Sequence, residues 1–161
     1  MAVVVQKYGG SSVGTTEKIK KIAQSIIKRK NKDAELVIVV SAMGDTTDDL
    51  LSLSKGIGED PDKRELDALL STGEIISSAL LAMAIKELGH DAISYTAYQI
   101  GIKTSGQYGK ALIEDIHGNK IKKSLNEGKI VIVAGFQGIN GEGDITTRSE
   151  EHTSELQSQD A

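Results

Sequence analysis

Three short apolar runs, each followed by a polar loop that contains glycine, constrain the fold of this chain more than any other feature. The runs cover residues 2–7, 36–40 and 129–134, and the loops cover residues 7–14, 41–47 and 135–147. A continuous apolar run of this length is typical of a strand that is covered on both faces, as in a parallel sheet. The carboxyl ends of parallel strands lie at the same edge of a sheet, so we expect the three loops to meet there. Ligands gather at this edge in such sheets.

Helix-like segments separate these runs. The first is marked by apolar residues that recur with a helical period, namely Ile19, Ile22, Ala23, Ile26 and Ile27. Further helices are predicted from residue 45 or 46 to 53, and over 63–71, 74–88 and 121–125, with additional short strands over 92–96 and 112–116. Gly73 interrupts the apolar pattern between the second and third of these helices. Strands that alternate with helices predict an α/β sandwich with a mainly parallel sheet.

Composition excludes several classes of protein. The 161 residues include no cysteine, which rules out disulfides and thiolate metal sites, and the three histidines show no metal-ligand spacing. The net charge of −4 argues against a general nucleic-acid binder. No apolar run approaches the roughly 20 residues of a membrane helix, and the amino terminus has no basic region of a secretory signal. We therefore expect a cytoplasmic protein with neither a membrane nor a nucleic acid as partner.

The first loop has the groups that bind phosphate. Gly9 and Gly10 allow close backbone approach to an anion, Lys7 adds a positive charge, and Ser11 and Ser12 add hydroxyl donors before a helix. A tight turn with a solvated lysine explains the same residues, and for an isolated Gly-Gly pair that is the simpler interpretation. The loop is neither a Walker P-loop, since no glycine precedes Lys-Ser or Lys-Thr, nor a dinucleotide fingerprint, since it lacks the GxGxxG spacing.

The second loop and the segment around Glu74 each allow two interpretations. Ser41, Asp45, Thr46 and Thr47 follow a buried strand, and helix capping or ligand binding explains them about equally well. Glu74 is explained structurally as an acid at a helix start, favoured by the helix dipole. Functionally, its carboxylate could receive the ammonium group of a substrate. The structural explanation is the simpler one.

Four segments taken together resemble the aspartate kinases of the amino acid kinase family. They are VQKYGGSSVG (5–14), VVSAMGDTTDDL (39–50), LLSTGEIISSALLAMAI (69–85), and IVAGFQG followed by GDITT (143–147). The first is close to the family signature KFGGTSV, and the order and spacing of all four also agree. The resemblance covers residues 1–147, and it implies the amino-terminal part of a three-layer α/β/α kinase domain with a mainly parallel sheet.

The resemblance also implies an activity. The family transfers the γ-phosphoryl group of ATP to the β-carboxylate of L-aspartate, the first step toward lysine, threonine and methionine. ATP is a co-substrate that arrives with Mg²⁺, no cofactor is tightly bound, the protein supplies no dedicated metal site, and the full-length enzymes form homo- or hetero-oligomers. Two alternatives stay open, namely an amino acid kinase with a glutamate-type substrate and a non-catalytic module that binds aspartate or another anion.

The resemblance also implies a role for each residue of this chain that matches a site position of the family. Lys7 would contact the transferring phosphoryl group and act as the catalytic residue. Thr47 and Glu74 would hold aspartate, with Glu74 bound to the α-ammonium group. The residues implied at the nucleotide phosphates are Lys7, Tyr8, Gly9, Gly10, Ser11 and Ser41.

The resemblance stops after Thr147. The family continues with LGRGGSD, which supplies an arginine for a substrate carboxylate, whereas residues 148–161 read RSEEHTSELQSQDA. Eleven of these residues correspond to the translation of a common sequencing-adapter oligonucleotide. We therefore expect residues 148–161 to be a non-native, disordered polar tail, and the chain as written to be inactive. The tail contributes −3 to the net charge and leaves residues 1–147 near neutral.

Overall fold

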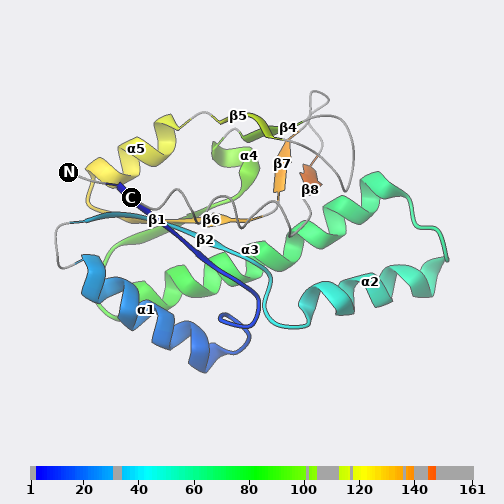
Figure 1. The fold of residues 1–161 in the computed structure, drawn as a ribbon, viewed down its shortest axis with the longest axis horizontal. Coiled ribbons are helices and arrows are strands. Elements are labelled where there is room, and N and C mark those ends of the chain that lie inside the picture. The colour runs from blue at the N-terminus through cyan, green and yellow to red at the C-terminus, as the bar shows by residue number, and fades with distance from the viewer. Residues whose placement is uncertain are drawn as a thin grey trace.

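A computed structural model describes residues 3–30, 34–100, 102–104, 113–116, 118–135, 137–139 and 145–147, so the predicted tail at 148–161 lies outside the described residues. Its main sheet has four parallel strands in the order β1-β2-β6-β3 (Figure 1). The strands are β1 (Val3–Tyr8), β2 (Glu35–Val40), β3 (Ala92–Tyr95) and β6 (Ile130–Ala134). The three apolar runs of the sequence are thus three adjacent parallel strands, as predicted.

Helices cover both faces of this sheet. On one face, α1 (Thr16–Lys30) and α3 (Lys63–Glu87) pack their apolar side chains against β2 and β6. On the other, α4 (Ala97–Ile100) and α5 (Asn119–Asn126) bury Ile100 and Leu125 in a cluster with Val37 of β2 and Val131 and Val133 of β6. Figure 1 shows the sheet between these two layers. The three-layer α/β/α architecture with a parallel main sheet is therefore confirmed.

The prediction of two helices over 63–71 and 74–88 was wrong, because α3 runs unbroken through Gly73. Asp62 caps its start by accepting a hydrogen bond from the backbone N–H of Glu65 at 3.0 Å. A glycine inside a helix costs roughly 1 kcal/mol relative to alanine, but Ser71 and Glu74 beside it are buried, and further along α3 Leu81 and Ile85 pack in the core. Tertiary packing therefore offsets the local preference that the sequence pattern suggested.

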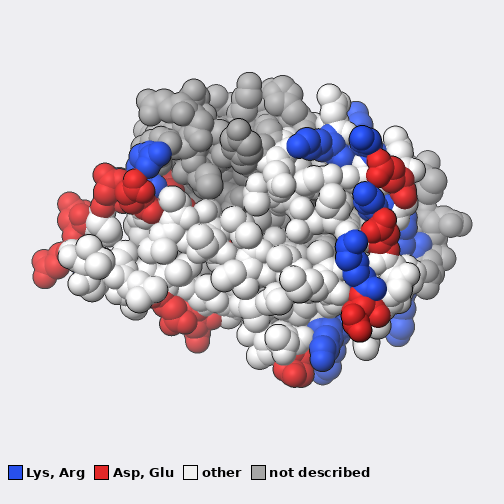
Figure 2. Space-filling model, turned by 180° about the vertical axis from the view of Figure 1, so that it is seen from behind, with Lys and Arg blue, Asp and Glu red and all other residues white. Residues whose placement is uncertain are grey.

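α3 is also apolar on part of its outer surface. From Ile75 to Ile85 it has no charged residue, and Ile76 and Met83 are exposed. α3 is long enough to cross a membrane, and its most apolar 18-residue stretch has a mean hydropathy of 1.7. However, 44% of that stretch is buried inside the protein. Its packing on the sheet explains that composition. On the side of the molecule in Figure 2, charged groups gather toward the two ends and leave a broad uncharged area between them.

A second, smaller sheet lies beside the main one. Its strands are ordered β5-β4-β7-β8 and pair in both directions (Figure 1). They are β4 (Ile102–Thr104), β5 (Ile113–Ile116), β7 (Gln137–Ile139) and β8 (Ile145–Thr147). The prediction of a loop over 135–147 was therefore wrong in part, since β7 and β8 form an antiparallel pair within it. Strands of three residues are too short to leave a periodic pattern.

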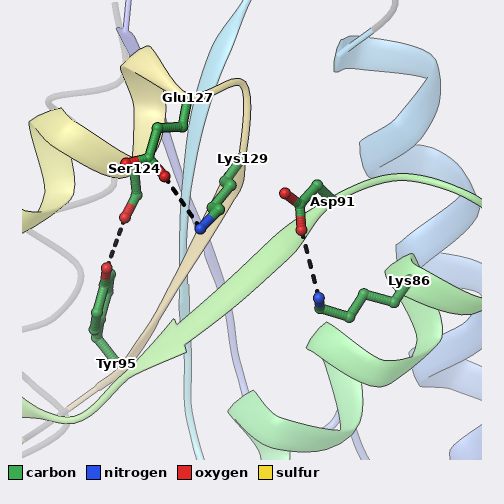
Figure 3. A network of polar contacts seen from close by, with 6 residues as sticks. All are labelled: Lys86, Asp91, Tyr95, Ser124, Glu127 and Lys129. Atoms are coloured by element: carbon green, nitrogen blue, oxygen red, sulfur yellow. Dashed lines mark hydrogen bonds and ion pairs between the residues drawn. The ribbon is translucent and has the colours of Figure 1, made fainter.

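Polar contacts attach β3 to the helices on either side of it (Figure 3). The hydroxyl groups of Tyr95 and of Ser124 on α5 are 2.6 Å apart, and Lys86 at the end of α3 is paired with Asp91 at 3.4 Å. Asp91 and Lys86 are both exposed, so this pair contributes little stability. The partly buried contact between Tyr95 and Ser124 therefore contributes more to stability than the Lys86–Asp91 pair.

Candidate functional site

The three loops meet at the carboxyl edge of the main sheet, as the sequence predicted. The N–H of Ser41 donates to the carbonyl of Tyr8 at 3.1 Å, and the N–H of Gly135 donates to the carbonyl of Val40 at 2.8 Å. These two hydrogen bonds extend the backbone pairing of the parallel sheet beyond the ends of the strands. They place the beginnings of all three loops side by side, because β1, β2 and β6 are neighbours in the sheet.

The first loop is a tight turn that leads into α1. The carbonyl of Gly9 accepts hydrogen bonds from the N–H groups of Ser12, at 3.1 Å, and Val13, at 3.3 Å. Ser11 and Ser12 are exposed, while the buried side chain of Val13 anchors the turn in the core. The tight-turn interpretation is thus correct as local geometry, and it leaves the serine hydroxyls on the surface, where a ligand could meet them.

Lys7 and Tyr8 lie at the end of β1, beside Val39 and Val40 of β2. Both side chains are half-buried, and the hydroxyl group of Tyr8 donates to the side-chain oxygen of Gln6 at 3.4 Å. Tyr8 also packs against the core. The position of Lys7 at the strand end therefore brings a cationic side chain to the same edge as the Gly9–Gly10 turn.

The second loop is bound directly to the first. The N–H of Gly44 donates to the carbonyl of Gly10 at 2.8 Å, and Gly44 itself has a φ of +41°, which favours glycine. A side chain at Gly10 would place its Cβ 3.1 Å from the carbonyl oxygen of Ala42. The two loops therefore approach each other as closely as their backbones allow.

Helix capping does not account for the polar residues of the second loop. α2 (Thr46–Ile57) begins after Asp45, whose side chain makes no capping hydrogen bond. The helix also extends beyond its predicted end at residue 53. Thr47 is exposed in the first turn of α2. The loop thus presents polar groups that its own fold does not use as caps.

Glu74 does not start a helix, so the structural explanation offered by the sequence pattern was wrong. It lies in the middle of α3 and is only 5% exposed. Burial raises the pKa of the Glu74 carboxyl to about 8, although a backbone hydrogen bond lowers it in part. The protonated form of this carboxyl is therefore favoured at neutral pH in the ligand-free chain.

Two buried oxygen atoms have no hydrogen-bond partner among the residues that the structure describes. They are Oγ of Ser41, at the start of the second loop, and Oε2 of Glu74. Buried polar atoms are nearly always hydrogen-bonded, so each such atom calls for an explanation. A ligand group that donates a hydrogen bond to Oε2 of Glu74, and a ligand group that bonds to Oγ of Ser41, would satisfy the two atoms.

Four further polar side chains on α3 are buried although the sequence pattern did not single them out, namely Asp67, Ser71, Ser77 and Ser78. Asp67 is 2% and Ser71 1% exposed, and both follow the helical spacing that leads to Glu74. The hydroxyl group of Ser71 donates to the carbonyl of Ala68 at 2.7 Å. A polar residue at every third or fourth position of an apolar helix was the available signal. Within the described part of the chain, no group of three or more acidic or histidine side chains could hold a metal ion.

The profile of the amino acid kinase family matches residues 2–156, nearly the whole chain. The chain belongs to the amino acid kinase family. Within it, the aspartokinase of Bacillus sp. (strain MGA3) is 54% identical over 147 residues, and aspartokinase 2 of Bacillus subtilis (strain 168) is 51% identical over the same length. Each alignment covers 91% of this chain but 36% of the relative, so the chain spans about a third of the relatives' length.

Solved structures of the family share the fold. The aspartate kinase from Synechocystis superposes with a TM-score of 0.79 at 42% identity, covering 92% of this chain and 24% of that one. Aspartokinase III of E. coli, in complex with aspartate and ADP, superposes with a TM-score of 0.81 at 19% identity, covering 93% of this chain and 44% of that one. At that identity the second comparison supports the fold alone. The resemblance read from the four sequence segments is thus confirmed at the level of the family and its fold.

Proposed function

We propose that this chain carries part of the active site of an aspartate kinase, which transfers the γ-phosphoryl group of ATP to the β-carboxylate of L-aspartate. The observation that carries the proposal is the pair of buried oxygen atoms on Ser41 and Glu74, which have no hydrogen-bond partner among the described residues. Ser41 follows β2 at the sheet edge where Lys7 and the Gly9–Gly10 turn end β1. The aspartokinase relatives, at about half identity over 147 residues, support the substrate assignment.

The roles follow from charge. The β-carboxylate of aspartate is already ionised near neutral pH, so the reaction needs little acid or base catalysis. The enzyme must instead bring two anions together and neutralise the charge of a loose transition state. Lys7 would contact the transferring phosphoryl group, with the Gly9–Gly10 turn and Ser11 at the phosphates of MgATP. A cation at this position is worth roughly 2–4 kcal/mol of transition-state stabilisation, as for other preorganised donors.

Glu74 would hold the other end of the substrate. An ammonium group beside a buried carboxyl favours its ionised form, so binding of aspartate would remove the proton that burial retains. The resulting ion pair would fix the α-amino group, and Thr47 at the start of α2 would contact the same substrate. Ser41 would bond to the nucleotide phosphates from the end of β2.

A chimeric enzyme tests this proposal. Residues 1–147 of this chain replace the matching segment of aspartokinase 2 of Bacillus subtilis, and hydroxylamine traps the acyl phosphate that is formed. We expect hydroxamate formation that requires both ATP and L-aspartate, with L-glutamate as the competing substrate. Lys7→Ala should lower kcat by about a hundredfold or more while the KM for aspartate changes little. Lys20→Ala, an exposed change on α1, is the matched control.

Three results would overturn the proposal. One is a chimera that folds but has no activity while the parent enzyme is active. Another is a Lys7→Ala variant with near-normal kcat, which would remove the role of that residue. Phosphorylation of L-glutamate in preference to L-aspartate would instead favour the alternative substrate class.

A further inference from the structure

Gly73 lies where α3 packs against the second loop. A Cβ atom at this position would stand 2.8 Å from the Cβ of Ala42 and 3.4 Å from Cγ2 of Thr46. Real Cβ atoms essentially never come within 3.0 Å of another heavy atom, so no side chain fits there without a shift of the helix or the loop. By contrast, Gly56 in α2 has nothing within 4 Å of its Cβ position.

This contact joins the two halves of the candidate site. On one side, Ala42 follows Ser41, and its carbonyl oxygen lies 3.1 Å from the Cβ position of Gly10. On the other side, Gly73 directly precedes Glu74 in α3. The segment around Ala42 is therefore held between the Gly9–Gly10 turn and the helix that carries the buried carboxyl group.

We propose that Gly73 is a positioning residue, whose missing side chain lets α3 dock on Ala42 and so sets the place of the Glu74 carboxyl group relative to the Gly9–Gly10 turn. The assignment of Glu74 to the substrate ammonium rests on the proposed function, whereas the docking contact does not. A glycine in the middle of a helix destabilises it relative to alanine. Close approach to Ala42 explains why α3 nevertheless has one here.

Moving one methyl group across the contact tests the proposal in the 161-residue chain. Gly73→Ala adds a methyl group that meets Ala42, and the double variant Ala42→Gly/Gly73→Ala restores the original number of atoms at the contact. The first readout is the titration of the Glu74 carboxyl group, followed by carbon-13 NMR. The second is the affinity for L-aspartate, measured by calorimetry.

The single variant should shift the Glu74 titration toward that of an ordinary carboxyl by about one pH unit or more, because water gains access to the loosened contact. Its affinity for aspartate should fall by about tenfold or more, since small displacements of a positioning group have large effects. The double variant should return both quantities to wild-type values. Gly56→Ala controls for a methyl group added to a helix, and Tyr95→Phe controls for loss of stability alone, so neither should move the titration.

Each outcome decides a specific point. A Gly73→Ala variant with unchanged titration and unchanged affinity overturns the proposal, and so does a double variant that is as impaired as the single one. If Gly73→Ala fails to fold, the double variant carries the test, because it must fold and titrate Glu74 as the wild type does. A wild-type chain that does not bind aspartate, but whose Glu74 titration is shifted by Gly73→Ala and rescued by Ala42→Gly, leaves the positioning role standing. If the chimeric enzyme then also fails to bind aspartate, the assigned substrate is refuted.

Discussion

The buried carboxyl group of Glu74 should make the stability of the chain fall as pH rises, and Glu74→Gln should remove that dependence. Folding raises the pKa of this group from 4.5 to about 8. Between these values the folded chain holds a proton that the unfolded chain has lost, so the unfolding free energy decreases with increasing pH. The stabilisation of the folded chain by the protonated Glu74 carboxyl is fully present below pH 4.5 and is lost progressively up to about pH 8.

The size of the effect follows from the same shift. Each pH unit in this range corresponds to about 1.4 kcal/mol, so the full change amounts to about 5 kcal/mol. Small domains unfold with roughly 5–15 kcal/mol, and the loss is therefore a large share of the total. A glutamine at position 74 cannot ionise and keeps nearly the same shape, so its own cost does not vary with pH.

Urea unfolding between pH 5 and pH 9 measures this contribution. We expect the wild-type free energy to fall by about 4 kcal/mol from pH 5 to pH 8 relative to that of Glu74→Gln, and then to level off. Glu17→Gln, at an exposed position in the first turn of α1, serves as control and should keep the wild-type slope. Parallel curves for the wild type and Glu74→Gln would refute the reasoning, because some other group would then cause the dependence.

Three further predictions concern the contacts described above. Tyr95→Phe removes the 2.6 Å contact with Ser124 and should lower the unfolding free energy by about 1 kcal/mol; an unchanged urea midpoint would contradict this. Gly135→Ala would place a Cβ 2.9 Å from the backbone oxygen of Val40, so the unfolding free energy should fall by about 1–3 kcal/mol and the Tm with it. An unchanged Tm would show that the backbone at this edge of the sheet shifts without cost. Binding of aspartate at pH 7 should release most of one proton from Glu74, because the ammonium group favours the ionised carboxylate. Calorimetry in buffers of different ionisation enthalpy measures this release, and zero release would exclude that carboxyl as the ammonium site.

The main sheet was predictable because burial on both faces affects every residue of a strand. Ile130 to Val133 are all buried, and all four are apolar. The loops were predictable for a related reason, since adjacent parallel strands end at one edge. The smaller sheet was not predictable, because strands such as Ile102–Thr104 hold too few residues for any period and depend on pairing between distant segments.

The errors in α3 have a common physical cause. Gly73 was read as a break because helix preference is a local property, whereas its role depends on Ala42, which lies in a different part of the chain. The pattern placed Glu74 at a helix start for the same reason, and only the fold determines which neighbours exclude water from its carboxyl group. The resemblance to aspartate kinases indicated a functional role for Glu74 where pattern analysis favoured a structural one.

The strand order β1-β2-β6-β3 restricts how this sheet can form during folding. β1, α1 and β2 are consecutive along the chain, so they can assemble early as a local unit. β6 is the last of the four strands to be synthesised, yet it lies between β2 and β3, with Val131 paired to both Val37 and Ile93. Contacts between such distant residues form slowly because the intervening chain must first be ordered. The arrival of β6 is therefore expected to limit the folding rate, and until then the inner edge of β2 stays open to pairing with other chains.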